Sequence, residues 1–328
     1  MKFYGKRETT SIYFSGGCSA TFYGDPLFPE AVHGNLFYCE PSLNIVHRCL
    51  LHRDGAGYRA ERAPEERQSE FLASTDQWFR PMGLRVGPEG SLYIVDMYRE
   101  IIEDYSAIPR FLQQQYGLNK GKAHGRIWRL HPENAGPAGH HSLAGRSNAE
   151  LVPMLDHANA WYRRTAQRLL IERKATDVVP LLEQLTLSDK TLKKTRTSPE
   201  GLLHTLHTLE GLRSLQNRDP ERLLSHEDYR VRVHALRLIK PGGRTRSSHR
   251  QLAARIVNMA IDDPDPSVRH QAVFTVGALR DPFFIRMLTA VASGENREDS
   301  WLMAAILSVC NQQGAPGLLR KALHESVS

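Results

Sequence analysis

Residues 78–99 read WFRPMGLRVGPEGSLYIVDMYR, and this stretch decides the fold of the first part of the chain. Aliphatic, aromatic and β-branched residues dominate 82–86 and 91–95, which is typical of two strands. The Gly-Pro-Glu-Gly segment at 87–90 predicts a tight reversal between them, because glycine tolerates the positive φ that such turns require. The stretch therefore predicts an antiparallel hairpin.

The same pattern surrounds this hairpin. Short strands are predicted before it at 20–23, 34–39, 44–51 and 58–62, and after it at 125–130. Consecutive strands of this kind are typical of β-propeller blades, so we expect about two blades, a partial β-propeller, in residues 1–132. Known propellers close with about four to eight blades. Either the chain is then a fragment of a longer protein, or its blades complete themselves against another chain.

Three motifs resemble the closing blades of bacterial membrane-bound dehydrogenase-domain proteins, which are related to the glucose/sorbosone dehydrogenase propellers. The motifs are EPSLNIVHR at 40–48, EFLASTDQWFRP at 70–81 and DMYREIIE at 96–103. The resemblance covers 15–132 in these motifs and the helical remainder by architecture only. It implies a propeller followed by HEAT-like repeats and often by a c-type haem domain.

The same resemblance implies an oxidoreductase that uses a quinone cofactor such as pyrroloquinoline quinone (PQQ) on a sugar or alcohol substrate. The chain departs from the family in two respects, since the earlier blades are missing and no Cys-x-x-Cys-His haem motif occurs. Because glucose/sorbosone-type sites draw on several blades, we expect this chain alone to lack activity. The alternative is a non-enzymatic scaffold that binds a protein partner through its helical repeats.

Polar residues at the strand ends form the candidate site, because loops of neighbouring blades emerge on one face of a propeller. The candidate cofactor-binding residues are Glu40, Asn44, Arg80, Asp96, Tyr98 and Arg99. An arginine and aromatic walls suit a sugar or the carboxylates of a quinone. Arg80 could equally pair with Asp96 or Glu103 within a blade. His47 is the candidate catalytic base, and it could equally point into blade packing.

A long insertion follows the second hairpin strand at 99–124. Residues 108–116 predict a short helix within it. Insertions of this length in compact blades are usually functional or capping elements. A lid over the channel and a cap that plugs the propeller or docks the repeats both remain open.

From residue 148 the pattern becomes helical, after a polar Gly/Pro linker at 133–147. Segments 162–170, 231–239 and 268–276 align on the central alanines Ala166, Ala235 and Ala272, with a weaker copy at Ala305. A period in the mid-thirties predicts a HEAT-like α-solenoid over 148–328, in which each small alanine lets a neighbouring helix approach closely. Ser198-Pro199 and Asp265-Pro266 predict helix starts.

The formal net charge of +7 includes basic clusters at 190–196 and 244–250, both in predicted inter-helix loops. Because no aromatic platform interleaves with them, solvated loop charge is the favoured interpretation and nucleic-acid binding is not expected. The adjacent histidines at 140–141 lack a third ligand nearby, so no metal site is predicted.

No apolar run approaches the ~20 residues that a membrane span needs, and the basic start lacks the apolar core of a signal peptide. The literal interpretation is a cytoplasmic protein, whereas the resemblance implies a periplasmic or cell-envelope location if the N-terminus is missing. Cys18, Cys39, Cys49 and Cys310 show no zinc spacing. Cys39 and Cys49 lie on neighbouring predicted strands, and buried thiols are favoured over a disulfide.

Overall fold

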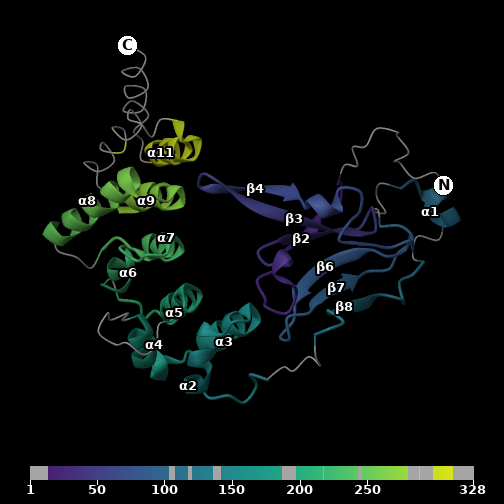
Figure 1. Cartoon of the computed structure of the whole chain (residues 1–328), viewed down its shortest axis with the longest axis horizontal. Coiled ribbons are helices and arrows are strands. Elements are labelled where there is room, and N and C mark those ends of the chain that lie inside the picture. Colours follow the sequence, from purple (N-terminus) through teal and green to yellow (C-terminus); the bar gives the residue numbers. More distant parts are fainter. Residues whose placement is uncertain are drawn as a thin grey trace, which may run out of the picture. The chain divides into compact units, whose positions relative to one another are not determined.

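The computed structural model of the chain describes residues 14–102, 108–116, 120–135, 142–186, 197–216, 218–242, 246–279, 288 and 298–312. Two antiparallel sheets form from the first part of the chain and helices from the rest (Figure 1). Two compact units result. The β unit comprises Met1–His52, Ala60–Ser142 and Ala158–Trp161, and the helical unit comprises Arg53–Arg59, Leu143–His157 and Tyr162–Ser328.

The first sheet has the strand order β1-β2-β3-β4, with β5 also paired to β3. Its strands are β1 (Cys18–Phe22), β2 (Leu36–Glu40), β3 (Ile45–Asp54), β4 (Gly57–Arg62) and β5 (Leu72–Ala73). The four strands predicted here are confirmed. The sequence missed β5, because two residues are too few to show a period.

The second sheet is a meander in the order β6-β7-β8. Its strands are β6 (Pro81–Val86), β7 (Leu92–Asp96) and β8 (Arg126–Leu130). The predicted hairpin is confirmed, with Leu84 opposite Ile94, and Gly90 supplies the positive φ of +87° in its turn. The strands of the described residues form no closed barrel.

The core of the β unit lies between the two sheets and includes Phe37, Val46, Leu84 and Ile94. Two hydroxyls of β1 also cover the open edge of β6. Ser19 Oγ accepts a hydrogen bond from Leu84 N at 2.7 Å, and Thr21 Oγ1 donates to Leu84 O at 3.1 Å. A backbone edge that would otherwise attract another strand is therefore satisfied by side chains.

Short helices connect and follow the strands. In the β unit they are α1 (Arg110–Tyr116), which confirms the predicted helix of the insertion, and the 3-10 turns Glu30–Val32 and Pro64–Glu66. The helical unit contains the 3-10 turns Val152–Asp156 and Thr176–Val178, and α2 (Asn148–Leu151), α3 (Ala160–Glu172), α4 (Val179–Thr186), α5 (Pro199–Gly211), α6 (Arg218–Leu223), α7 (Tyr229–Leu238), α8 (Arg246–Asp262), α9 (Pro266–Leu279) and α11 (Ser300–Gln312).

One sequence prediction in this unit is wrong. The basic cluster at 244–250 was expected in a loop, whereas α8 begins at Arg246 and contains most of it. The helix continues because Leu252, Ile256 and Ala260 form a buried face at helical spacing. The cluster at 190–196, the histidines at 140–141 and Glu103 lie outside the described residues.

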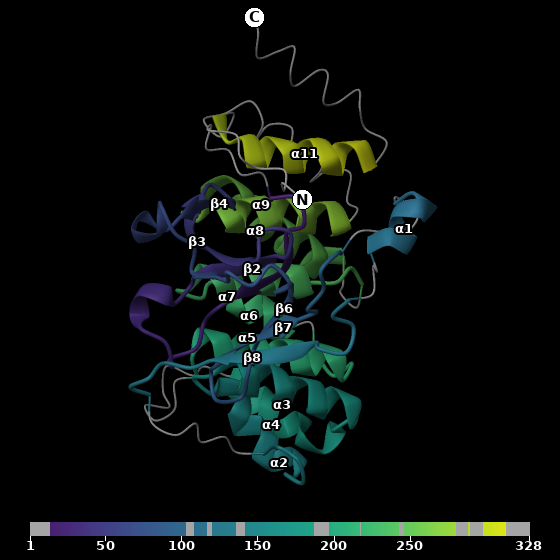
Figure 2. The same ribbon diagram turned by 90° about the vertical axis from the view of Figure 1, so that its right-hand side faces the viewer.

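The alanine register is confirmed. Ala166, Ala235 and Ala272 are fully buried, and Ala305 is 1% exposed. Their helices α3, α7, α9 and α11, together with α5, follow one another in chain order along one row in both views (Figure 1, Figure 2). A methyl side chain is what such close helix packing requires, since any larger group would separate the axes.

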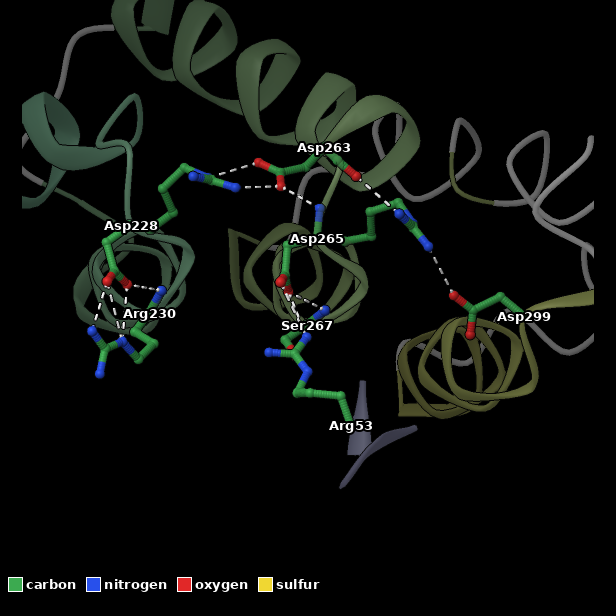
Figure 3. Close-up of polar contacts among 9 residues, drawn as sticks. Arg53, Asp228, Arg230, Asp263, Asp265, Ser267 and Asp299 are labelled. Carbon is green, nitrogen blue, oxygen red and sulfur yellow. Dashed lines mark hydrogen bonds and ion pairs between the residues drawn. The ribbon is translucent and has the colours of Figure 1, made fainter. Parts of the chain in front are cut away.

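An arginine three residues before each of three alanines holds the turn that precedes its helix. Arg163, Arg232 and Arg269 each donate from Nη1 to the carbonyl oxygen six residues earlier, at 2.6, 2.8 and 2.9 Å. Arg232 also binds Asp263 through Nη2 at 2.8 Å, and Arg269 binds Asp299 at 3.3 Å (Figure 3). The end of α8 is thereby linked to α7, and the segment before α11 to α9, by charge-assisted hydrogen bonds.

The predicted helix starts are also confirmed. Ser198 Oγ accepts from Gly201 N at 3.1 Å, and Asp265 Oδ1 accepts from Ser267 N at 2.8 Å. Asp265 has a second role within the helical unit, because Arg53 Nη2 binds its carboxylate at 3.0 Å (Figure 3). The same guanidinium lies 4.4 Å from the ring centre of Tyr229.

Candidate functional site

Arg80, the leading candidate for binding an anionic cofactor, lies directly before β6 and is 3% exposed. Its guanidinium donates three hydrogen bonds to backbone carbonyls: Nε to Arg99 O at 3.0 Å, Nη1 to Pro41 O at 2.8 Å and Nη2 to Glu100 O at 2.8 Å. Burial lowers the pKa of this guanidinium from its ordinary value. The side chain binds two other segments of backbone, at Pro41 and at 99–100, rather than pairing with Asp96.

Asp96 ends β7 and is equally buried. Its Oδ1 accepts hydrogen bonds from Arg80 N and Tyr98 N, both at 2.9 Å. Its Oδ2 accepts from Trp128 Nε1 at 3.1 Å and lies 3.8 Å from Arg126 Nε. The carboxylate therefore binds the backbone just before β6 and just after β7, and it also contacts side chains of β8.

Tyr98 and Arg99 form the more accessible side of this cluster. Tyr98 has a φ of +51°, which is strained for a side chain of this size. Its ring lies 5.7 Å from that of Trp78, and the guanidinium of Arg126 lies over it at 4.0 Å. The backbone of Gly121 approaches so closely that a Cβ there would lie 2.4 Å from Tyr98 O. Arg99 Nη1 donates to the carbonyls of Met97 and Tyr98 at 3.1 and 3.0 Å.

Glu40 and Asn44 lie at the two ends of the turn between β2 and β3, and each binds the backbone of neighbouring segments. Glu40 is fully buried, and its carboxylate accepts from Gly16 N at 2.9 Å and Ser42 N at 3.2 Å. Asn44, with a φ of +59°, donates from Nδ2 to Gln77 O at 3.2 Å and to Phe79 O. Asn44 thus holds the segment that leads into Arg80.

His47 lies elsewhere in the β unit. It is 3% exposed, and its Nδ1 lies 2.6 Å from Glu70 Oε2. The other carboxylate oxygen of Glu70 forms an ion pair with Arg62. Val46, the preceding residue of β3, faces the core between the sheets, so His47 points to the opposite face of its strand. No contact among the described residues joins His47 to Arg80 or Asp96.

The structure therefore brings Arg80, Asp96, Tyr98 and Arg99 together, as the sequence predicted, and leaves His47 apart. The sequence did not identify Arg126 and Trp128, which complete the environment of Asp96. The predicted strand at 125–130, next to the hairpin, was the sequence signal that could have placed them near Asp96. No group of three or more His, Cys, Asp or Glu in the described part of the chain could hold a metal ion.

A second polar cluster, which the sequence also missed, crosses the helices. Gln167 Oε1 of α3 lies 2.6 Å from His204 Nδ1 of α5, and His207 Nε2 of α5 lies 2.8 Å from His234 Nδ1 of α7. Arg237 Nε of α7 donates to Gln271 Oε1 of α9 at 3.0 Å. We call these six residues the cross-helix row.

Two imidazoles of this row, those of His204 and His234, are neutral near pH 7. Burial, followed by the charges of Arg163 and Arg164, lowers the pKa of His204 to about 4. Burial, followed by His207 and Arg237, lowers the pKa of His234 to about 4 as well. The positive charge beside these two histidines therefore resides on arginines.

The four cysteines are free thiols, and burial raises the pKa of the Cys39 thiol to about 12. Cys39 pairs across the sheet with Val46, and Cys49 with Leu36, so the two thiols do not face each other. None of the described helices is long and apolar enough to cross a membrane.

Comparison with known proteins gives one match. No curated protein and no solved structure matches the chain. The resemblance to dehydrogenase propellers therefore stays a prediction. Residues 2–134 match the model of a domain of unknown function, DUF7133, so the segment that holds both sheets is similar to that family.

Proposed function

We propose that this chain works by binding a protein partner through its helices, and that its sheets supply a rigid platform. In this proposal the sheets are two blades of a propeller similar to the glucose/sorbosone dehydrogenases, and the helices are HEAT-type repeats. One observation carries it: the buried guanidinium of Arg80, expected to hold a quinone, is used by three carbonyls of the chain itself.

The helices offer exposed cations without acidic partners in the described part of the chain. Arg164 on α3 and Arg237 on α7 are exposed, and neither has a carboxylate partner among the described residues. Repeats that pack through small residues build long continuous surfaces, and such surfaces commonly bind other proteins. The buried alanines of α3, α7, α9 and α11 support that architecture here.

The test is capture of partners on the immobilised full chain, followed by reconstitution with each purified candidate. Hydrogen exchange on the reconstituted complex then shows which amides the partner protects. We expect protection in α3, α5, α7 and α9. Protection confined to residues 78–99, or the failure of every candidate to reconstitute, would contradict the proposal.

A quinone site on the β unit is the second candidate. The observation that favours it is the strained Tyr98 beside Trp78 and Arg99, because strained backbone is concentrated at functional sites. Calorimetric titration of the full chain with PQQ tests it, with Arg99→Lys as the variant, since lysine cannot make the bidentate contact of arginine with a carboxylate. Absence of heat with PQQ would rule out this candidate for the chain as it stands.

A further inference from the structure

The cross-helix row contains imidazole nitrogens that can accept further hydrogen bonds. Gln167 Oε1 can only accept, so His204 Nδ1 must be the donor in their 2.6 Å contact. A neutral imidazole carries a single N–H, which leaves His204 Nε2 as an acceptor with no partner among the described residues.

The same reasoning applies one helix further. His207 Nδ1 lies 3.4 Å from Glu210 Oε2, which favours the proton on that nitrogen. His207 Nε2 is then the acceptor in the 2.8 Å contact, and His234 Nδ1 is its donor. His234 Nε2 is consequently a second open acceptor, and both acceptors need N–H donors from a ligand.

Charge on this surface is unbalanced. The carboxylates that border the row are already paired, Glu210 with Lys240 at 3.3 Å and Glu200 with Arg230 at 2.6 Å. The guanidinium of Arg164 binds no carboxylate within the described ranges, and Arg237 uses only Nε, toward Gln271. Arg164 lies one helical turn from Gln167 on α3, and Arg237 one turn from His234 on α7, so two exposed guanidinium groups border the row.

Helix spacing sets the length of a ligand that reaches both arginines. Helix α5 lies between α3 and α7, since it hydrogen-bonds to each of them. Two interaxial steps of about 8–10 Å place the arginines roughly 16–20 Å apart. An extended chain advances about 3.3 Å per residue, so about five or six residues span that distance.

We infer that the cross-helix row and Arg164 bind an extended acidic peptide segment, with carboxylates about five or six residues apart on Arg164 and Arg237. Backbone N–H groups between those carboxylates donate to Nε2 of His204 and His234. A phosphodiester backbone carries no N–H donors, and the row contains no Phe, Tyr or Trp on which bases could stack. The inference rests on the proposed function and specifies the partner of the same surface.

Selection from a random displayed dodecapeptide library on the full chain tests this inference. We expect the bound peptides to be enriched in Asp or Glu pairs at a separation of five or six. The Arg164→Glu/Arg237→Glu double variant should weaken their binding roughly tenfold or more, because attraction becomes repulsion at both ends. The matched control is Arg222→Glu on α6, an exposed arginine outside the row, and it should retain binding.

The absence of acidic enrichment in the selected peptides would overturn the inference, and so would equal binding to the double variant. Tighter binding of a single-stranded oligonucleotide than of the selected peptides would assign the surface to nucleic acid instead. A reconstituted partner that the double variant still binds would refute this surface and leave the proposed function standing. If no partner reconstitutes at all, the proposed function itself fails.

Discussion

Replacing Arg80 by methionine should destabilise the β unit severely. Methionine keeps an apolar stem of similar length and removes the guanidinium that joins Arg99, Pro41 and Glu100 through their carbonyls. Because the side chain is 3% exposed, water cannot fully replace the lost donors. The substitution therefore distinguishes an arginine that stabilises the fold from one that binds a ligand.

The magnitude follows from the three hydrogen bonds. A hydrogen bond to a charged group contributes about 1.5–3 kcal/mol to the free energy of unfolding, and a buried acceptor left unpaired costs about 1–3 kcal/mol. The bond to Pro41 O is fully buried, whereas those to Arg99 O and Glu100 O are partly buried and can be rehydrated. We therefore expect a loss of roughly 3–5 kcal/mol for Arg80→Met. Arg80→Lys should lose most of that, because an ammonium cannot reproduce the planar fork.

Hydrogen exchange of peptides that cover residues 78–100 is the appropriate assay, since it reports on the β unit independently of the helices. The matched control is Arg85→Met on β6, the strand that follows Arg80, where the arginine is exposed and the effect should stay within about 0.5 kcal/mol. Unchanged protection in Arg80→Met would refute the reasoning. That result would favour a ligand-binding role for Arg80.

Three further predictions concern the helical unit. Ala272→Leu should lower stability by ~1–3 kcal/mol in urea denaturation because the site is fully buried, whereas Ala278→Leu, exposed on the same helix, should not; equal midpoints would show the register to be wrong. Asp263→Asn should lower the free energy of unfolding by about 1–3 kcal/mol, because it weakens the bidentate contact with Arg232. Asp262→Asn, at the exposed neighbouring position, should lower it far less, and thermal unfolding compares the two variants. Burial holds the pKa of His234 at about 4, below the unfolded value of about 6.5, so the unfolded chain binds protons first on acidification and stability falls between those values. His234→Gln should reduce the difference between urea midpoints at pH values of about 7 and about 4.5, and an unchanged difference would contradict this assignment.

The sequence determined the local elements of this protein. Alternating apolar residues located the strands around residues 82–95, and Gly90 marked the turn, because both features depend only on neighbours in the chain. The helical period likewise located the buried alanines. Burial repeats with the geometry of a strand or helix, and a sequence records that repeat directly.

Outside the predicted helix caps, the tertiary structure alone decided what the polar side chains bind. The sequence placed Arg80 and Asp96 close together correctly. It could not show that Arg80 binds the carbonyl of Pro41, 39 residues earlier in the chain. The contact of His207 with His234 spans 27 residues and follows from helix packing, which no local period encodes. Long polar side chains take partners from whichever segments folding brings within about 3 Å, so their roles emerge only when the chain has folded.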